Sequence, residues 1–279
     1  MNVSFPGLGI SFEISRVAFS LFGMSVYWYG IIIALGFVAG IFLASRAAGK
    51  LGENPDVALD LALYCGPVGI ICARLYYVMF KFEDYVSDPL EIFNLRNGGL
   101  AIYGGIIGAV CAAAVYCKIK KKPLLKMADI GAVGLITGQM IGRWGNFFNQ
   151  EAFGSNTTLP WGMISEKTTA FLETLKSEGV QVNPLMPVHP TFLYESLWSL
   201  MTLLVLWIII RNHQFDGQVF FVYGALYGLG RFWIEALRTD SLMFGPFRIS
   251  QLVALLSVVI FGALYIITKC KKREKLAQN

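Results

Sequence analysis

The chain has 279 residues, of which 56% are hydrophobic and 15% charged, and its mean hydropathy is +0.59. This composition is too apolar for an ordinary soluble domain, in which about 25% of residues are charged. The net charge of +5 does not indicate a nucleic-acid partner, because most lysines lie in short clusters at the ends of apolar stretches. We therefore expect one all-α integral membrane domain over residues 1–279, with the lipid bilayer as its surroundings.

The first sixteen residues place apolar side chains among polar and glycine positions, which predicts a segment that lies on the membrane surface. Seven apolar stretches then have the length of a membrane-spanning helix, about 20 residues. They predict helices over residues 22–45, 57–80, 100–117, 127–147, 190–210, 217–237 and 249–268. No basic residue precedes Arg16 and no small-residue cleavage site follows the first stretch, so we expect this stretch to remain in the mature protein.

Basic residues divide unevenly between the two sides that seven spans define. One side carries thirteen lysines and arginines, the other side six, and four arginines lie within the spans. Since cytoplasmic loops carry the excess of positive charge, we expect the N-terminus outside and the C-terminus in the cytoplasm. The connection 148–189 then forms a small extracytoplasmic head, in which residues 165–178 predict one amphipathic helix.

Cysteine and histidine usage gives no support for a metal site. The five cysteines lie in or beside apolar stretches, no C-x-x-C pair occurs, and the chain has only two histidines. We expect the cysteines to be small buried hydrophobes.

Arginine within a span is costly and needs a partner or a ligand. Arg74 lies near the outer end of the second predicted helix, where it either snorkels to the surface or contributes to a site. Arg143 lies in the fourth predicted helix, on a polar stripe with Gln139 and Asn146, beside a stripe of glycines that allows close helix packing.

The sixth predicted helix carries a second polar stripe. Tyr227, Arg231, Glu235 and Arg238 recur at intervals of four, four and three, so they share one face. Glu235 can pair with either arginine. A buried structural ion pair is the alternative to a functional site, although ionisable residues within spans more often mark function.

Helix direction places these groups at one depth. The fourth and sixth predicted helices run outward, so Arg143 lies about 6 Å and Arg231 about 9 Å below the outer ends of these helices. Tyr103 and Tyr29 lie on inward-running helices, about 5 and 10 Å below the outer ends of those helices. This convergence predicts a shared pocket in the outer half of the bilayer. Two guanidinium groups suit a phosphate, so the residues indicate a site for an anionic lipid headgroup without indicating a reaction.

The stretch GRWGNFFNQEAFG, residues 142–154, resembles the signature of bacterial prolipoprotein diacylglyceryl transferases. Similarity also covers, in order, residues 26–37, 72–80, 97–109, 189–196 and 230–240. The resemblance implies a seven-helix enzyme of the bacterial cell membrane. It implies transfer of the diacylglyceryl group of phosphatidylglycerol to the lipobox cysteine in the signal peptide of a preprolipoprotein, with release of glycerol phosphate and without cofactor or metal. A transporter or binding protein for an anionic lipid or solute is the alternative, but we find no internal repeat and no midplane charge.

The resemblance also implies which residues form the site. The family's essential positions fall on Tyr29, Arg143, Asn146, Glu151, Gly154, Arg231 and Glu235. We also expect Gly104 to contribute to binding of phosphatidylglycerol. Many members have a histidine before the paired glycines of the third helix, where this chain has Tyr103.

Arg143 and Arg231 are expected to neutralise the leaving phosphate, and the thiol nucleophile belongs to the substrate. Tyr103 and Glu151 are both candidates for the proton acceptor, although Tyr103 suits hydrogen bonding to the headgroup better because of its high reference pKa of about 10. His189 precedes Pro190 at a helix start, where either capping or a site role fits.

Overall fold

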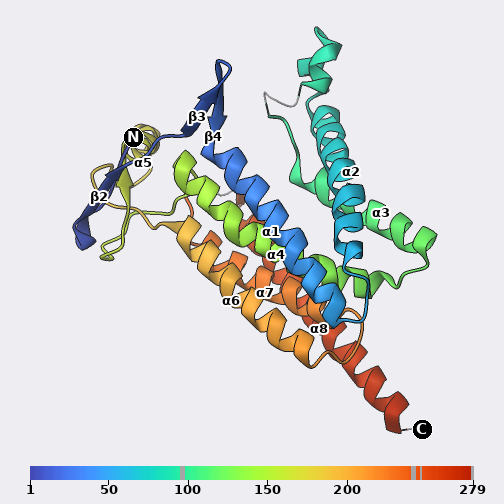
Figure 1. Ribbon diagram of the computed structural model, residues 1–279. Helices are drawn as coiled ribbons and strands as arrows, with labels where there is room; N and C mark the ends of the chain where they lie inside the picture. Colours follow the sequence, from blue (N-terminus) through green and yellow to red (C-terminus); the bar gives the residue numbers. More distant parts are fainter. Residues whose placement is uncertain (95–97, 240–242, 246, 278–279) are drawn as a thin grey trace.

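The structure is a computed structural model that describes residues 1–94, 98–239, 243–245 and 247–277. Within these ranges the chain is mainly α-helical (Figure 1). The helices are α1 (Trp28–Lys50), α2 (Asp56–Phe80), α3 (Ile102–Lys120), α4 (Leu124–Asn149), α5 (Glu166–Ser177), α6 (Thr191–Arg211), α7 (Gln218–Glu235) and α8 (Ile249–Ala277). The strands are β1 (Asn2–Phe5), β2 (Ile10–Glu13), β3 (Val17–Leu21), β4 (Met24–Tyr27), β5 (Ile164–Ser165), β6 (Met243–Phe244) and β7 (Phe247–Arg248).

Six of the described helices are long and apolar enough to cross a membrane, namely α1, α2, α3, α4, α6 and α8. They match six of the seven predicted spans, although α8 continues beyond the predicted end at residue 268. The seventh predicted span is the helix α7, which is not among these six. It is shorter than its neighbours and carries Gln218, Arg231 and Glu235. That α7 also crosses the membrane stays a prediction.

The core of the bundle is built around α4, which packs against α1, α6 and α7 (Figure 1). Glycines permit the closest approach, because a Cβ atom at Gly40 of α1 would lie 2.8 Å from the carbonyl oxygen of Gly134 in α4. Helices α2 and α3 form a separate pair that is drawn beside α1 (Figure 1). In that pair a Cβ atom at Gly104 would lie 2.5 Å from the carbonyl oxygen of Cys72. Gly104 therefore serves helix packing.

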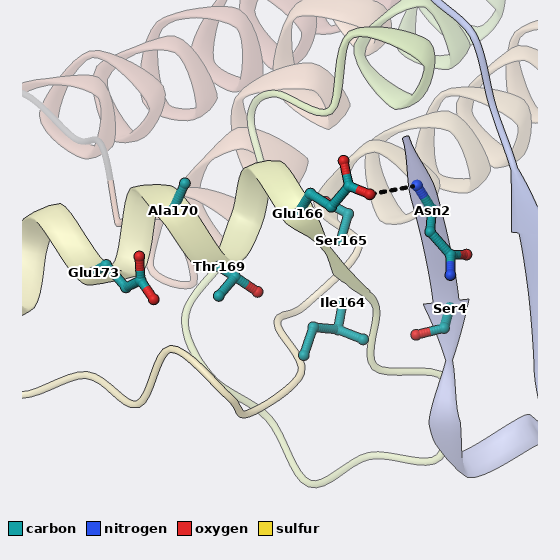
Figure 2. A pocket seen from close by; sticks show the side chains of 8 residues that line it. All are labelled: Asn2, Ser4, Ile164, Ser165, Glu166, Thr169, Ala170 and Glu173. Atoms are coloured by element: carbon teal, nitrogen blue, oxygen red, sulfur yellow. Dashed lines mark hydrogen bonds between the residues drawn. The ribbon is translucent and has the colours of Figure 1, made fainter.

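The head combines two distant segments of the chain. Strand β1 lies between β2 and β5, and α5 follows β5 directly, as predicted for residues 165–178. Val3, Met163, Leu172 and Val188 are buried together with Phe147, near the C-terminal end of α4. The first sixteen residues thus include the strands β1 and β2, which complete the head. That this segment lies on the membrane surface stays a prediction. The opposite face of the sheet borders an open polar groove lined by Asn2, Ser4, Ile164, Ser165, Glu166, Thr169, Ala170 and Glu173 (Figure 2).

The first helix begins six residues later than predicted. Residues 17–27 form the β3–β4 hairpin, and α1 starts at Trp28. The turn is formed by Phe22 and Gly23, both with positive φ, as a two-residue hairpin turn of this kind requires. Apolar composition alone did not distinguish this hairpin from the first turns of a helix.

Arg74 does not snorkel to the surface. It is buried, and its guanidinium donates to the carbonyl oxygens of five residues in the α2–α3 connection: Glu91, Ile92, Asn94, Gly98 and Gly99. The guanidinium also lies over the ring of Tyr85, 5.2 Å from its centroid. Because a guanidinium has five N–H donors, these five carbonyl groups can use all of them. Arg74 therefore holds the α2–α3 connection in place.

Glu53, in the turn between α1 and α2, joins that turn to the start of α4. Its carboxylate lies 2.6 Å from Lys122 Nζ and 3.4 Å from Lys126 Nζ. Hydrogen bonding to Lys122 is the main cause that lowers the pKa of Glu53 below 4.5. A lowered carboxyl pKa contributes stability above the unfolded-state pKa, and this contribution is lost as the pH falls through the folded-state value. Glu53→Gln should therefore lower the thermal midpoint at pH 7, and the difference from the unsubstituted protein should narrow below pH 4.5. A difference that is constant with pH would contradict this role.

Candidate functional site

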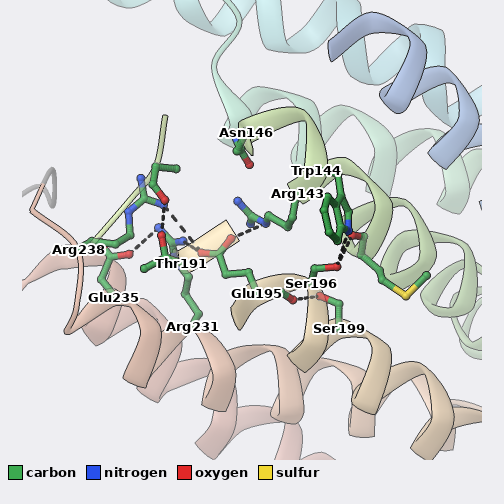
Figure 3. Close-up of polar contacts among 12 residues, drawn as sticks. Arg143, Trp144, Asn146, Thr191, Glu195, Ser196, Ser199, Arg231, Glu235 and Arg238 are labelled. Atoms are coloured by element: carbon green, nitrogen blue, oxygen red, sulfur yellow. Dashed lines mark hydrogen bonds and ion pairs between the residues drawn. The ribbon is translucent and has the colours of Figure 1, made fainter. Parts of the chain in front are cut away.

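Glu195 of α6 is the junction of the polar cluster (Figure 3). One of its carboxylate oxygens pairs with Arg143 Nε of α4, and the other lies 3.0 Å from Arg231 Nη1 of α7. The Glu195 side chain is 8% exposed, whereas those of Arg143 and Arg231 are each 23% exposed. Three helices thus bring two guanidinium groups to one buried carboxylate, and both arginines keep part of their surface open.

Glu235, the last residue of α7, and Arg238, just beyond it, extend the cluster. Arg231 Nη2 lies 2.6 Å from the Glu235 carboxylate, one helical turn along the same face. Arg238 Nη1 lies 3.9 Å from Glu195. The predicted stripe on this helix therefore forms ion pairs both within α7 and across to α6.

A second polar group lies where α4 ends. Glu151 Oε1 accepts hydrogen bonds from Asn146 Nδ2 at 3.0 Å and Asn149 Nδ2 at 3.3 Å. Arg16 and Lys167 both donate to the backbone carbonyl of Asn149. Burial, and then the charge of Arg16, lowers the pKa of Lys167. Asn146 and Glu151 are thus held together beside a positively charged rim.

A cavity of about 20 Å³ lies against the arginine cluster. It is lined by Gln139, Arg143, Glu195, Trp198, Ser199, Tyr227, Gly230, Arg231 and Ile234. This volume holds about one water molecule. The structure therefore shows a small polar niche between α4, α6 and α7.

Two further site residues predicted from the sequence contact helices that carry this cluster, Tyr29 against α4 and Gly154 against α6. The Tyr29 ring packs on the backbone of α4, since a Cβ atom at Gly145 would lie 2.8 Å from Tyr29 Cδ2. Gly154 fits between the head and the end of α7, because a Cβ atom there would lie 2.9 Å from the carbonyl oxygen of Leu237. The absence of a side chain at Gly154 allows the head to pack against the segment that carries Arg238.

Tyr103 lies apart from the arginine cluster. It is the second residue of α3, is 53% exposed, and forms no hydrogen bond to any residue that the structure describes. Helix α3 packs mainly on α2 rather than on α4, α6 or α7. The structure therefore brings Tyr29, Arg143, Asn146, Glu151, Gly154, Arg231 and Glu235 to one region, and leaves Tyr103 and Gly104 with the α2–α3 pair.

His189 has a local role in the geometry. Its Nδ1 lies 3.2 Å from the Tyr194 hydroxyl, which also accepts a hydrogen bond from Trp161 Nε1 at 2.8 Å. Burial lowers the pKa of His189, which favours its neutral form. The backbone of His189 meanwhile pairs with Gly154 and Ser155. His189 thus connects the head to the start of α6.

Comparison with known proteins gives the family of this chain. Residues 16–268 match the model of the prolipoprotein diacylglyceryl transferase family. The chain belongs to this family. Proteins named phosphatidylglycerol–prolipoprotein diacylglyceryl transferase are similar to it over most of their lengths. The relative from Clostridioides difficile is 45% identical over 92% of this chain and 97% of its own, and the one from Bacillus cytotoxicus is 44% identical over 95% of each. A third relative, from Clostridium perfringens, is 48% identical over 93% of this chain and 97% of its own.

Membership of the diacylglyceryl transferase family confirms the resemblance of residues 142–154 and makes this chain a transferase of lipoprotein maturation. The six apolar helices agree with a multi-pass membrane enzyme. Glu195 is not among the site residues predicted from the sequence, although it lies inside the similar stretch 189–196. Glu195 is the one carboxylate in the apolar stretch 190–210, and that isolation was the available signal.

Proposed function

We propose that the Arg143–Glu195–Arg231 cluster binds the phosphate of phosphatidylglycerol while its diacylglyceryl group passes to the lipobox cysteine thiol of a preprolipoprotein. The supporting observation is that two guanidinium groups from different helices meet at one carboxylate within a membrane-spanning bundle. Planar guanidinium groups bind phosphate oxygens with bidentate geometry, and both groups keep exposed surface. The names of the relatives supply the two substrates.

The reaction that fits this geometry is a displacement at carbon. The cysteine sulfur attacks the sp³ glyceryl carbon that bears the phosphate, so that a C–S bond forms while the C–O bond breaks. The bonding electrons leave with the phosphate oxygen as glycerol phosphate, and the thiol proton passes to an acceptor. The enzyme contributes by aligning the two substrates and by stabilising charge on the leaving phosphate in a water-poor site.

Glu151 is the proton acceptor that the geometry favours. It is held by Asn146 and Asn149, at the end of the helix that carries Arg143, and an ionised carboxylate can accept a proton directly. Tyr103 remains the second candidate from the sequence, but it has no contact with the arginine cluster among the described residues.

Tyr103→Phe separates these two candidates. Because the phenol lies on α3, outside the cluster, we expect turnover to stay within about tenfold, below the 10²- to 10⁴-fold that a lost general base would cost. The measurement is turnover against pH, with Glu151→Gln as the matched variant that should lose activity. A loss of 10²-fold or more in Tyr103→Phe would make Tyr103 the acceptor.

We also propose that the cluster faces the outer leaflet, with the N-terminus outside, the C-terminus in the cytoplasm and seven spans. The uneven distribution of basic residues supports this orientation. A cysteine at position 167, in the head, should react with an impermeant reagent from outside intact cells. A cysteine at position 122 should react only after the cells are opened. The reverse pattern would invert the orientation of the site.

The enzymatic proposal is tested with purified protein, phosphatidylglycerol and a lipobox peptide, with the products analysed by mass spectrometry. A thioether between the peptide cysteine and diacylglycerol, together with free glycerol phosphate, is the expected result. If phosphatidylglycerol is bound without any thioether product, the chain would instead be a lipid-binding protein or transporter.

A further inference from the structure

Asp129, in the second turn of α4, is fully buried at the opposite end of the bundle from the arginine cluster. Its carboxylate accepts from the backbone N–H of Gly217 and from that of Phe220, each at 2.8 Å. The ring nitrogen Nε2 of His213 lies 3.1 Å from the same carboxylate. All three partners lie at the beginning of α7 or in the connection that precedes it.

Helix α7 depends on a side chain of α4 to accept from its first N–H groups. The first N–H groups of a helix have no partner within the helix, and a side chain at the N-cap normally accepts from them. The N-cap of α7 is Gly217, which has no side chain, and its first turn contains no acidic residue. The carboxylate of Asp129 supplies both the acceptor and the negative charge that this terminus favours.

Arg143 and Arg231 lie at equal distances along their helices from the contact between Asp129 and Gly217. Fourteen residues separate Asp129 from Arg143 along α4, and fourteen separate Gly217 from Arg231 along α7. At 1.5 Å per residue each interval is about 21 Å. At the far end both arginines reach Glu195, so α4 and α7 are joined at one end by Asp129 and at the other by the cluster.

The position of α7 along α4 is not fixed strongly by the membrane itself. With 18 residues, α7 is about 27 Å long, which is less than the hydrocarbon thickness of about 30 Å. It also carries Gln218, Arg231 and Glu235, and it is not among the six described helices that are long and apolar enough to cross a membrane. Contacts with the protein must therefore set its depth, and Asp129 is the buried charged contact at its beginning.

We propose that Asp129 is a positioning residue for the phosphate site, which sets the register of α7 against α4 so that Arg143 and Arg231 reach one phosphate. This inference rests on the proposed function. Asp129 acts through the arginines and does not touch the substrate. A displacement of about 1 Å at a reacting centre can lower the rate about 10²-fold, so loss of this contact affects chemistry about 21 Å away.

The test compares Asp129→Asn with Asp60→Asn in the full-length purified protein. Asp60 is the matched control, because its carboxylate accepts from the Tyr116 hydroxyl at 2.9 Å and joins α2 to α3, which carry neither arginine. The kinetic measurement is the KM for phosphatidylglycerol in mixed micelles and the KM for the lipobox peptide. The structural measurement is the distance between nitroxide labels at the exposed positions 135 in α4 and 229 in α7, in a variant that lacks the five native cysteines.

Asp129→Asn should raise the KM for phosphatidylglycerol about tenfold or more and shift or broaden the label distance, with the peptide KM nearly unchanged. Asp60→Asn should leave both measurements as in the unsubstituted protein. An unchanged lipid KM and label distance in Asp129→Asn would overturn the proposal, even if less folded protein is obtained, because Asp129 would then only stabilise the fold. If the unsubstituted protein forms no thioether, the proposed function fails, whereas the label distance still tests whether Asp129 sets the register of α7.

Discussion

Substituting lysine for Arg143 or Arg231 is expected to lower turnover about 10²- to 10³-fold, the range seen when one donor to a developing negative charge is removed. Lysine keeps the positive charge but cannot present two parallel N–H groups to a phosphate. It also cannot preserve the arrangement at Glu195, where Arg143 and Arg231 each pair with a different carboxylate oxygen. Turnover should be measured with phosphatidylglycerol and lipobox peptide at saturating concentrations.

Arg46→Lys provides the control for charge and membrane insertion. Arg46 lies near the far end of α1, is exposed, and stacks over the ring of Phe42 at 5.0 Å. This variant should retain normal turnover. Near-normal turnover in Arg143→Lys or Arg231→Lys would remove that residue from the phosphate site.

Glu195→Gln is expected to destabilise the protein by about 3 kcal/mol, because two partly buried arginines lose their shared carboxylate. Phosphatidylglycerol should restore more stability in this variant than in the unsubstituted protein. The reason is that the phosphate and the Glu195 carboxylate compete for the same guanidinium donors, and glutamine competes less well.

The thermal midpoint in detergent, with and without phosphatidylglycerol, measures this difference. Diacylglycerol, which lacks the phosphate, should give no such shift. Ser196→Ala is the matched variant, since Ser196 follows Glu195 in α6 but bonds to Trp144 and Met140 rather than to the arginines. Equal lipid-induced shifts in Glu195→Gln and in the unsubstituted protein would show that phosphate and Glu195 do not share a site.

Much of the helical architecture could be predicted because each apolar stretch is long and continuous. Spacing along one helix also predicted that Glu235 can pair with Arg231 or Arg238, and the structure shows the pair with Arg231. Glu195 was missed because a single carboxylate in an apolar stretch has no periodicity, and its partners lie on two other helices. Local patterns identify the faces of a helix but not which faces of different helices meet.

The other differences between prediction and structure also arise from contacts between segments that are distant in the sequence. Residues 2–5 and 10–13 alternate in character like strands, but β1 is completed by β5, more than 150 residues away, and no local pattern shows that pairing. The depth of Arg74 was predicted from its helix, yet its role depends on carbonyl groups of the following connection. The position of a charged residue along its helix therefore did not show which groups it contacts.

The central claim is that the lipid phosphate binds between Arg143 and Arg231, and lipid binding to the double variant Arg143→Gln/Arg231→Gln tests it most directly. Native mass spectrometry of the purified proteins measures the amount of phosphatidylglycerol that each retains, with Arg46→Gln as the charge-matched control for one substitution. We predict that the unsubstituted protein and Arg46→Gln retain phosphatidylglycerol and that the double variant loses it. Retention of phosphatidylglycerol by the folded double variant at the unsubstituted level would contradict the phosphate site.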